Sequence, residues 1–121
     1  MIIREYTIVV NNNSTKLPQT ITLYKGDSGL LLKLSLSNFK FDISSIGRID
    51  ASIVNKDTAK LTTLKDLKHE NGVIILPILE DGGLVLDYTG TYQVQLHIYD
   101  ANLNRVSIPT FNILCKDNIY S

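Results

Sequence analysis

The chain of 121 residues contains no tryptophan, one cysteine, three prolines and two histidines. A single cysteine excludes an internal disulfide, and two histidines with one cysteine cannot supply the usual four-ligand zinc site. An excess of charge of one sign is also missing, because 12 Lys and Arg residues balance 12 Asp and Glu residues. Nucleic-acid-binding proteins normally carry a basic stripe that neutralises phosphates, so we expect no nucleic-acid partner.

Long uncharged apolar runs are absent as well. The N-terminal run MIIREYTIVV carries Arg4 and Glu5 in its middle, which fits neither a signal peptide nor a membrane span. We therefore expect no membrane partner, and synthesis in a cytoplasm without secretion by a cleaved signal. With 44% hydrophobic and 20% charged residues, the composition is that of one folded domain over residues 1–121. Cys115 lies in the apolar run FNILC and is expected in the core.

The dominant pattern along the chain is an alternation of apolar and polar residues. It is clearest in LLLKLSLS (30–37) and TYQVQLHIY (91–99), and it is typical of strands with one buried face. Similar runs are IIREYTIVV, QTITLY, RIDASIV, GVIILPI and RVSIPTFNILC, separated by turn-forming segments such as Asn11–Ser14. Short strands at this spacing predict an all-β protein, an immunoglobulin-like antiparallel β-sandwich.

Three segments leave the local structure open. Leu61, Leu64 and Leu67 recur every third residue, so a short helix around residues 60–69 is one alternative to strand. Residues 1–10 form either an extra strand or an arm that docks on a neighbour. In the run 105–115 the apolar parity switches at Pro109–Thr110. Because proline donates no ladder hydrogen bond, we expect a bulge or an edge position there.

The tetrapeptide GDSG at residues 26–29 suggests catalysis, because it surrounds the nucleophilic serine of chymotrypsin-like proteases. A nucleophilic Ser28 would need a general base within hydrogen-bond reach. Both histidines follow Ser28, the chain is about half the size of a two-barrel protease, and Leu30 replaces the second glycine of the motif. Gly26 and Gly29 permit positive φ, and Asp27 hydrogen-bonds locally, so we interpret the segment as a turn. The sequence predicts no enzyme and no catalytic residue.

Two acidic stretches raise the question of a metal site. DANLN (100–104) begins like a calcium loop, but Arg105 and Phe111 stand where that loop needs Gly and Glu. EDGGLVLD (80–87) places three acids near two glycines, an arrangement that surface calcium sites also use. We predict solvated acids, no metal and no cofactor, and leave calcium binding at 80–87 as an alternative.

The stretch DYTGTYQVQL places Gly90 two residues before Tyr92 at the start of an expected strand. Immunoglobulin-like sandwiches often carry a tyrosine corner at such a place, with the hydroxyl bonded back to the chain. A plain core aromatic is the alternative for Tyr92.

From about residue 20 to residue 116 the order of these pieces resembles the N-terminal domain of phage baseplate upper proteins. These are virion proteins of tailed phages of Gram-positive hosts, and they anchor receptor-binding proteins. The resemblance rests on ITLYKGD, LLLKLSLS, IDASIVNKD, ENGVIILPI and the hairpin DYTGTYQVQLHIYDANLNRVSIPTFNILC. It carries over Gly26 and Asp27 as an early turn, and Gly90 and Tyr92 as late structural positions. The chain departs from the family by its additional first strand and by lacking the helical linker and C-terminal part.

The resemblance implies a non-enzymatic structural protein of a bacteriophage virion, located in the particle and oligomeric there. It implies a baseplate or tail-tip attachment module that binds neighbouring virion proteins through complementary surfaces and edge strands. A capsid decoration or head-fibre protein of the same fold is an alternative. A carbohydrate-binding module is a second alternative, which the 7% aromatic content disfavours because few rings are left to stack on sugars.

Overall fold

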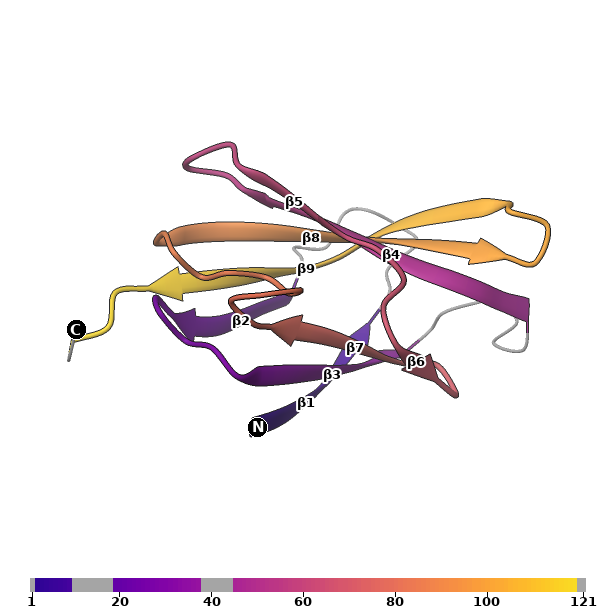
Figure 1. Ribbon diagram of the computed structural model, residues 1–121, viewed down its shortest axis with the longest axis horizontal. Helices are drawn as coiled ribbons and strands as arrows, with labels where there is room; N and C mark the ends of the chain where they lie inside the picture. Colours follow the sequence, from indigo (N-terminus) through magenta and orange to yellow (C-terminus); the bar gives the residue numbers. More distant parts are fainter. Residues whose placement is uncertain (1, 10–18, 38–44, 120–121) are drawn as a thin grey trace.

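The computed structural model describes residues 2–9, 19–37 and 45–119, which form two β-sheets packed face to face (Figure 1). The turn expected over Asn11–Ser14 lies outside these ranges. The strands are β1 (Ile2–Val9), β2 (Gln19–Tyr24), β3 (Leu30–Ser37), β4 (Ile46–Asn55), β5 (Leu61–Leu64), β6 (His69–Glu70), β7 (Val73–Ile78), β8 (Gly90–Asp100) and β9 (Arg105–Lys116).

The all-β sandwich expected from the alternation is confirmed, but the sheets are mixed and not wholly antiparallel. Sheet A has the order β1-β3-β7-β6, and sheet B has the order β2-β9-β8-β4-β5. β1 runs parallel to β3, and β2 runs parallel to β9, while the other pairs are antiparallel. Alternation reports which face of a strand is buried and not which way the strand runs. The alternation pattern therefore could not predict the two parallel edge pairs.

The core lies between the two inner faces and follows the alternation residue by residue. Sheet A contributes Leu30, Leu32 and Leu34 of β3 and three residues of β7, and sheet B contributes mainly β4, β8 and β9. Leu84 and Leu86, in the segment that returns from sheet A to sheet B, cover one side of this core. Cys115 is buried and free, as the apolar run around it predicted. Among the described residues, none forms a helix of the length and apolarity that a membrane crossing needs.

The helix considered around residues 60–69 was wrong. Residues 61–64 form β5, which pairs with β4, and residues 69–70 form β6. Thr62 and Thr63 are β-branched and favour strand over helix. Asp66 then adopts a φ of 55°, which right-handed helix excludes. The three leucines do not share one buried face either, because Leu61 is exposed and Leu67 is buried.

The parity switch in β9 is a β-bulge, as expected. Gln95 pairs with Pro109 and Val94 pairs with Phe111, so Thr110 is the extra residue. β2 pairs only with residues 111–116 of β9. The half of β9 that includes Pro109 therefore has β8 as its neighbour and no contact with β2 in the ladder.

Candidate interaction surfaces

The GDSG segment forms the turn between β2 and β3. Gly26 and Gly29 have φ values of 87° and 72°. The Asp27 amide donates to the Tyr24 carbonyl at 3.0 Å, and the Tyr24 amide donates to the Asp27 carboxylate at 3.2 Å. Ser28 is exposed, and the hydrogen bonds of His97 go to other serines. Gly26 and Asp27 are therefore residues of this turn.

Gly90 and Tyr92 begin β8 beside the polar side chains of Asn55 and Asp57. Gly90 has a φ of 122°, and a Cβ on it would collide with the Asp57 carboxylate. The Tyr92 hydroxyl donates to the Tyr88 carbonyl at 3.0 Å, a bond back to the chain four residues earlier. Asn55 is buried, and its side-chain oxygen accepts the Asp57 and Thr58 amides. Burial raises the pKa of the Tyr92 hydroxyl, and the hydrogen bonds to Asn55 and Tyr88 oppose the shift.

At the other end of β8, the DANLN segment forms a hydrogen-bonded hairpin tip. The Asp100 carboxylate accepts the Asn102 and Asn104 amides, both at 2.9 Å, and the Asn104 side-chain amide at 3.0 Å. The Leu103 amide donates to the Asp100 carbonyl at 3.1 Å. The hydrogen bonds from Asn104 lower the pKa of Asp100, with those from Asn102 adding to the effect. The hydrogen bonds of the Asp100 carboxylate are thus made with amide groups of Asn102 and Asn104 within the turn.

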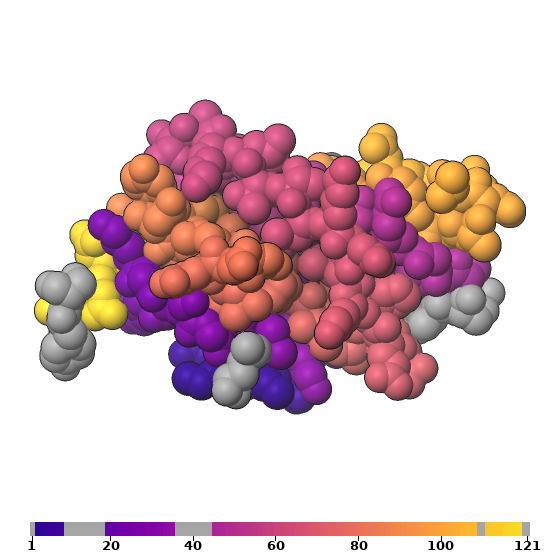
Figure 2. Space-filling view, viewed as in Figure 1, coloured from indigo at the N-terminus to yellow at the C-terminus, as the bar shows by residue number. Residues whose placement is uncertain are grey.

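Leu103 lies in this tip, between Asn102 and Asn104. Its side chain is 74% exposed, the second highest value among the exposed large hydrophobic residues. Its φ is 63°, in the left-handed region that glycine and asparagine adopt most readily. Figures 1 and 2 show the tip projecting beyond the sandwich, at the end opposite the C-terminus.

The outer face of sheet B is polar and internally hydrogen-bonded. His97 lies between two serines on neighbouring strands, with Nε2 2.8 Å from the Ser52 hydroxyl and Nδ1 2.8 Å from the Ser107 hydroxyl. Gln93 and Gln95 extend the same face along β8 and are exposed. Both ring nitrogens of His97 are thereby engaged.

A second polar cluster on this sheet anchors the crossing segment, residues 65–68, which leads from β5 in sheet B to β6 in sheet A. The Arg48 guanidinium lies over the Tyr99 ring at 4.4 Å and contacts the Asp50 carboxylate at 3.2 Å. Asp50 is buried, and its carboxylate accepts the Asp66 amide at 2.9 Å. The Leu67 amide donates to the Ile49 carbonyl at 2.7 Å. The crossing segment is therefore anchored to β4 at two consecutive residues.

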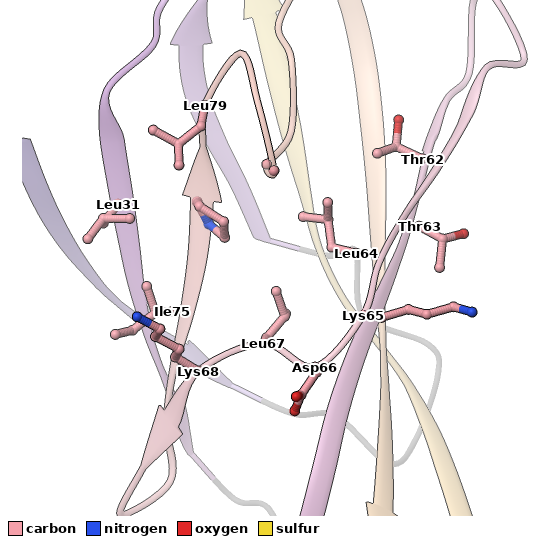
Figure 3. Close-up of a pocket in the computed structure, with 13 residues that line it drawn as sticks. Leu31, Thr62, Thr63, Leu64, Lys65, Asp66, Leu67, Lys68, Ile75 and Leu79 are labelled. Atoms are coloured by element: carbon pink, nitrogen blue, oxygen red, sulfur yellow. The ribbon is translucent and has the colours of Figure 1, made fainter.

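The crossing segment forms one wall of a groove, and β7 with the adjoining part of β3 forms the other (Figure 3). This β5–β7 groove has a volume of about 800 Å³, and its apolar lining includes Leu31, Leu64, Leu67, Ile75, Pro77 and Leu79. Figure 3 shows Leu64 and Leu67 directed toward its centre, with Asp66 and Lys68 near one end. This groove was not predicted from the sequence. The helix alternative for residues 60–69 would place the same leucines on one buried face. The β-branched pair Thr62–Thr63 is the signal that could have indicated the strand.

The outer face of sheet A adjoins the groove and is more apolar than that of sheet B. Register places Ile3, Leu31 and Pro77 in one row across three strands. Ile3 is 51% exposed, and Leu31 and Pro77 are half-buried. The groove thus continues into an apolar row that ends at the free edge of β1.

The acidic loop at residues 80–87 does not gather its carboxylates. Asp87 forms an ion pair with Lys60 at 3.3 Å. Within residues 2–9, 19–37 and 45–119, no group of three His, Cys, Asp or Glu side chains is placed to hold a metal ion. The candidate surfaces of the described chain are therefore the hairpin tip, the β5–β7 groove and the two outer sheet faces.

Comparison with known proteins finds a likeness in fold. No family model and no curated protein sequence matches the chain. The structure is similar to the N-terminal domain of phage TP901-1 ORF48, a baseplate protein, with a TM-score of 0.54 and 9% sequence identity. The match covers 93% of this chain and 98% of that domain. At this identity the likeness shows a common fold, the sandwich of a phage baseplate protein.

Proposed function

We propose that this chain is a non-enzymatic structural protein of a bacteriophage virion, and that it works as an attachment module at the baseplate or tail tip. The observation that supports this most is the fold likeness to the N-terminal domain of phage TP901-1 ORF48, which extends over nearly the whole of both chains. Fold alone does not imply function, so the proposal also draws on the character of the surfaces. The polar groups of the hairpin tip bond to one another, as do those at the start of β8, while the groove has an apolar lining and Leu103 is exposed.

Such a distribution suits a protein that acts by binding other proteins. Exposed apolar side chains at rigid positions supply contact area at low cost in conformational entropy. Within residues 2–9, 19–37 and 45–119, β1, β2 and β5 each lie at a sheet edge, and backbone donors and acceptors at such an edge are groups that a neighbouring strand could use. The partners would be other structural proteins of the particle.

The test is immunogold electron microscopy of phage particles from a lysate in which this protein is made. An antibody raised against residues 1–121 would be used, and the same antibody absorbed with the purified protein serves as the control. Label at the tail tip is the expected result. Label over the head would overturn the baseplate location in favour of the decoration or head-fibre role. Particles without label would overturn the virion role itself.

A further inference from the structure

The hairpin tip carries a leucine at a position of left-handed backbone conformation, although the turn does not need an apolar side chain there. Leucine in the left-handed region is strained by roughly 1–2 kcal/mol relative to residues that adopt it freely. Asparagine stands on both sides of Leu103, and at position 103 it would adopt this φ with less strain. The hydrogen bonds centred on Asp100 nevertheless hold the leucine outward, 74% exposed. Strain kept at an exposed, rigid position indicates a use outside the turn.

The β5–β7 groove is the apolar recess on the described surface that matches such a projection. Its volume of about 800 Å³ lies in the range of recesses that enclose a drug-sized ligand. It is therefore large enough for a leucine side chain together with part of the turn that carries it. Leu64 and Leu67 form its centre (Figure 3).

Charges on the tip and on the groove are complementary. On the tip, Asp100 and Arg105 lie at the two ends of the turn that contains Leu103. In the groove, Asp66 and Lys68 flank Leu67 in the chain and lie near one end of the recess (Figure 3). The groove lining thus carries Lys65, Asp66 and Lys68, and the tip carries Asp100 and Arg105, so a docked tip can turn its acid toward a lysine and its arginine toward Asp66. Such pairing fixes orientation more than it adds affinity.

We propose that the Leu103 tip of one copy of this chain inserts into the β5–β7 groove of a second copy. The two surfaces are different parts of the molecule, so the contact is heterologous and each copy keeps one tip and one groove free for further copies. Repetition of the contact would close a ring or extend a row. This self-association goes beyond the attachment role proposed above and depends only on surfaces of this chain.

The test is sedimentation of the purified full chain from micromolar to millimolar concentration. The average mass is expected to rise above the 13.5 kDa of one chain as the concentration increases. Leu103→Asn keeps a residue that tolerates the left-handed region and removes the apolar projection. Leu31→Lys places a charge at a half-buried, outward position of the groove. Each variant alone is expected to lose association by on the order of tenfold or more, as for a central contact residue, while thermal unfolding shows that both remain folded.

Mixing the two variants separates this contact from other forms of association. The Leu31→Lys chain retains its tip and the Leu103→Asn chain retains its groove, so an equimolar mixture is expected to form dimers and nothing larger. A wild-type chain that stays monomeric at millimolar concentration would overturn the proposal. Association that survives in both single variants would also overturn it, and would indicate pairing through free strand edges. None of these results depends on where the protein lies in a particle.

Discussion

A residue with positive φ lies at the start of β8 and another lies just beyond its end, but the first is glycine and the second is leucine. At its start, the chain adopts a φ of 122° at Gly90, where a side chain would collide with Asp57. Beyond its other end, the hairpin adopts a φ of 63° at Leu103, with the side chain in solvent. Glycine at position 90 is required by what surrounds it. Leucine at position 103 is required by nothing within the described fold, so the local packing explains one end and not the other.

Gly90→Ala is expected to have the largest effect on stability. The new methyl group would displace the Asp57 side chain and force alanine into a disfavoured φ, which together cost about 2–3 kcal/mol. Urea unfolding of the purified chain measures this. Gly82→Ala is the matched control, because Gly82 has a φ of 78° with no atom within 4 Å of the added Cβ. It should lose only about 1 kcal/mol, and equal losses at both sites would contradict the role given to Asp57.

Tyr92→Phe is expected to cost about 1 kcal/mol, because the Tyr88 carbonyl loses the donor that reaches it from a buried side chain. Tyr24→Phe, at an exposed tyrosine, is the control and should be neutral. The variant should also change the pH dependence of stability. Burial raises the pKa of Tyr92 above 10.0, so the folded state keeps a proton that the unfolded chain releases.

The sign of this linkage places the effect in the alkaline range. The stability due to the raised pKa is fully present below pH 10 and is lost as the pH rises through the folded pKa. The free energy of unfolding should therefore fall less steeply above pH 10 in Tyr92→Phe than in the wild type. Parallel alkaline slopes for the two proteins would mean that Tyr92 ionises alike in both states.

Leu103→Gly is expected to act in the opposite direction to Gly90→Ala. Relief of the left-handed strain exceeds or balances the entropy that glycine adds to the unfolded chain, so stability should stay equal or rise by up to about 1 kcal/mol. Thermal and urea unfolding measure the change. Ala101→Gly in the same turn is the control, and it should lose about 0.5–1 kcal/mol. A clear loss in Leu103→Gly would mean that the leucine supports the fold.

Acidification is expected to give the smallest effect, confined to the hairpin tip. The hydrogen bonds from Asn104 lower the pKa of Asp100 below 3.8, so the stabilisation is present above that value. It is lost as the pH falls through the folded pKa. Amide resonances of Asn102 and Asn104 should shift and exchange faster in that range, with the Asn104 amide unchanged above pH 5. Insensitivity of both amides would contradict the part given to the carboxylate.

The sequence predicted the strands of the sandwich well and their partners poorly. Alternation placed Leu30, Leu32 and Leu34 of β3 in the core, and the parity switch located the bulge at Thr110. Strand direction and sheet membership depend on contacts between distant residues, so the parallel neighbours of β1 and β2 were not visible. The leucine period at 61–67 left a short helix open as an alternative to strand, because a period of three also fits a helix.

The candidate surfaces were the least predictable part. The groove needs Leu31 of β3 and Leu64 of β5 on one recess, although they lie in different sheets. The exposure of Leu103 depends on its place in the turn and not on the residue type. The residues chosen from the sequence, Gly26, Asp27, Gly90 and Tyr92, all lie at turns or corners, because local backbone chemistry is what a sequence shows directly.

The pairing of β2 with β9 has a consequence for how the protein is made. Gln19 lies opposite Phe111 in this ladder, and Tyr24 lies opposite Lys116. During translation β2 is synthesised before β3 to β8, yet its partner strand β9 follows all of them. Until then its Ile21 and Leu23, both buried in the finished sandwich, have no inner face to join. Folding of sheet B must therefore wait until β9 has been synthesised, and a nascent chain stalled before β9 should be a substrate for chaperones.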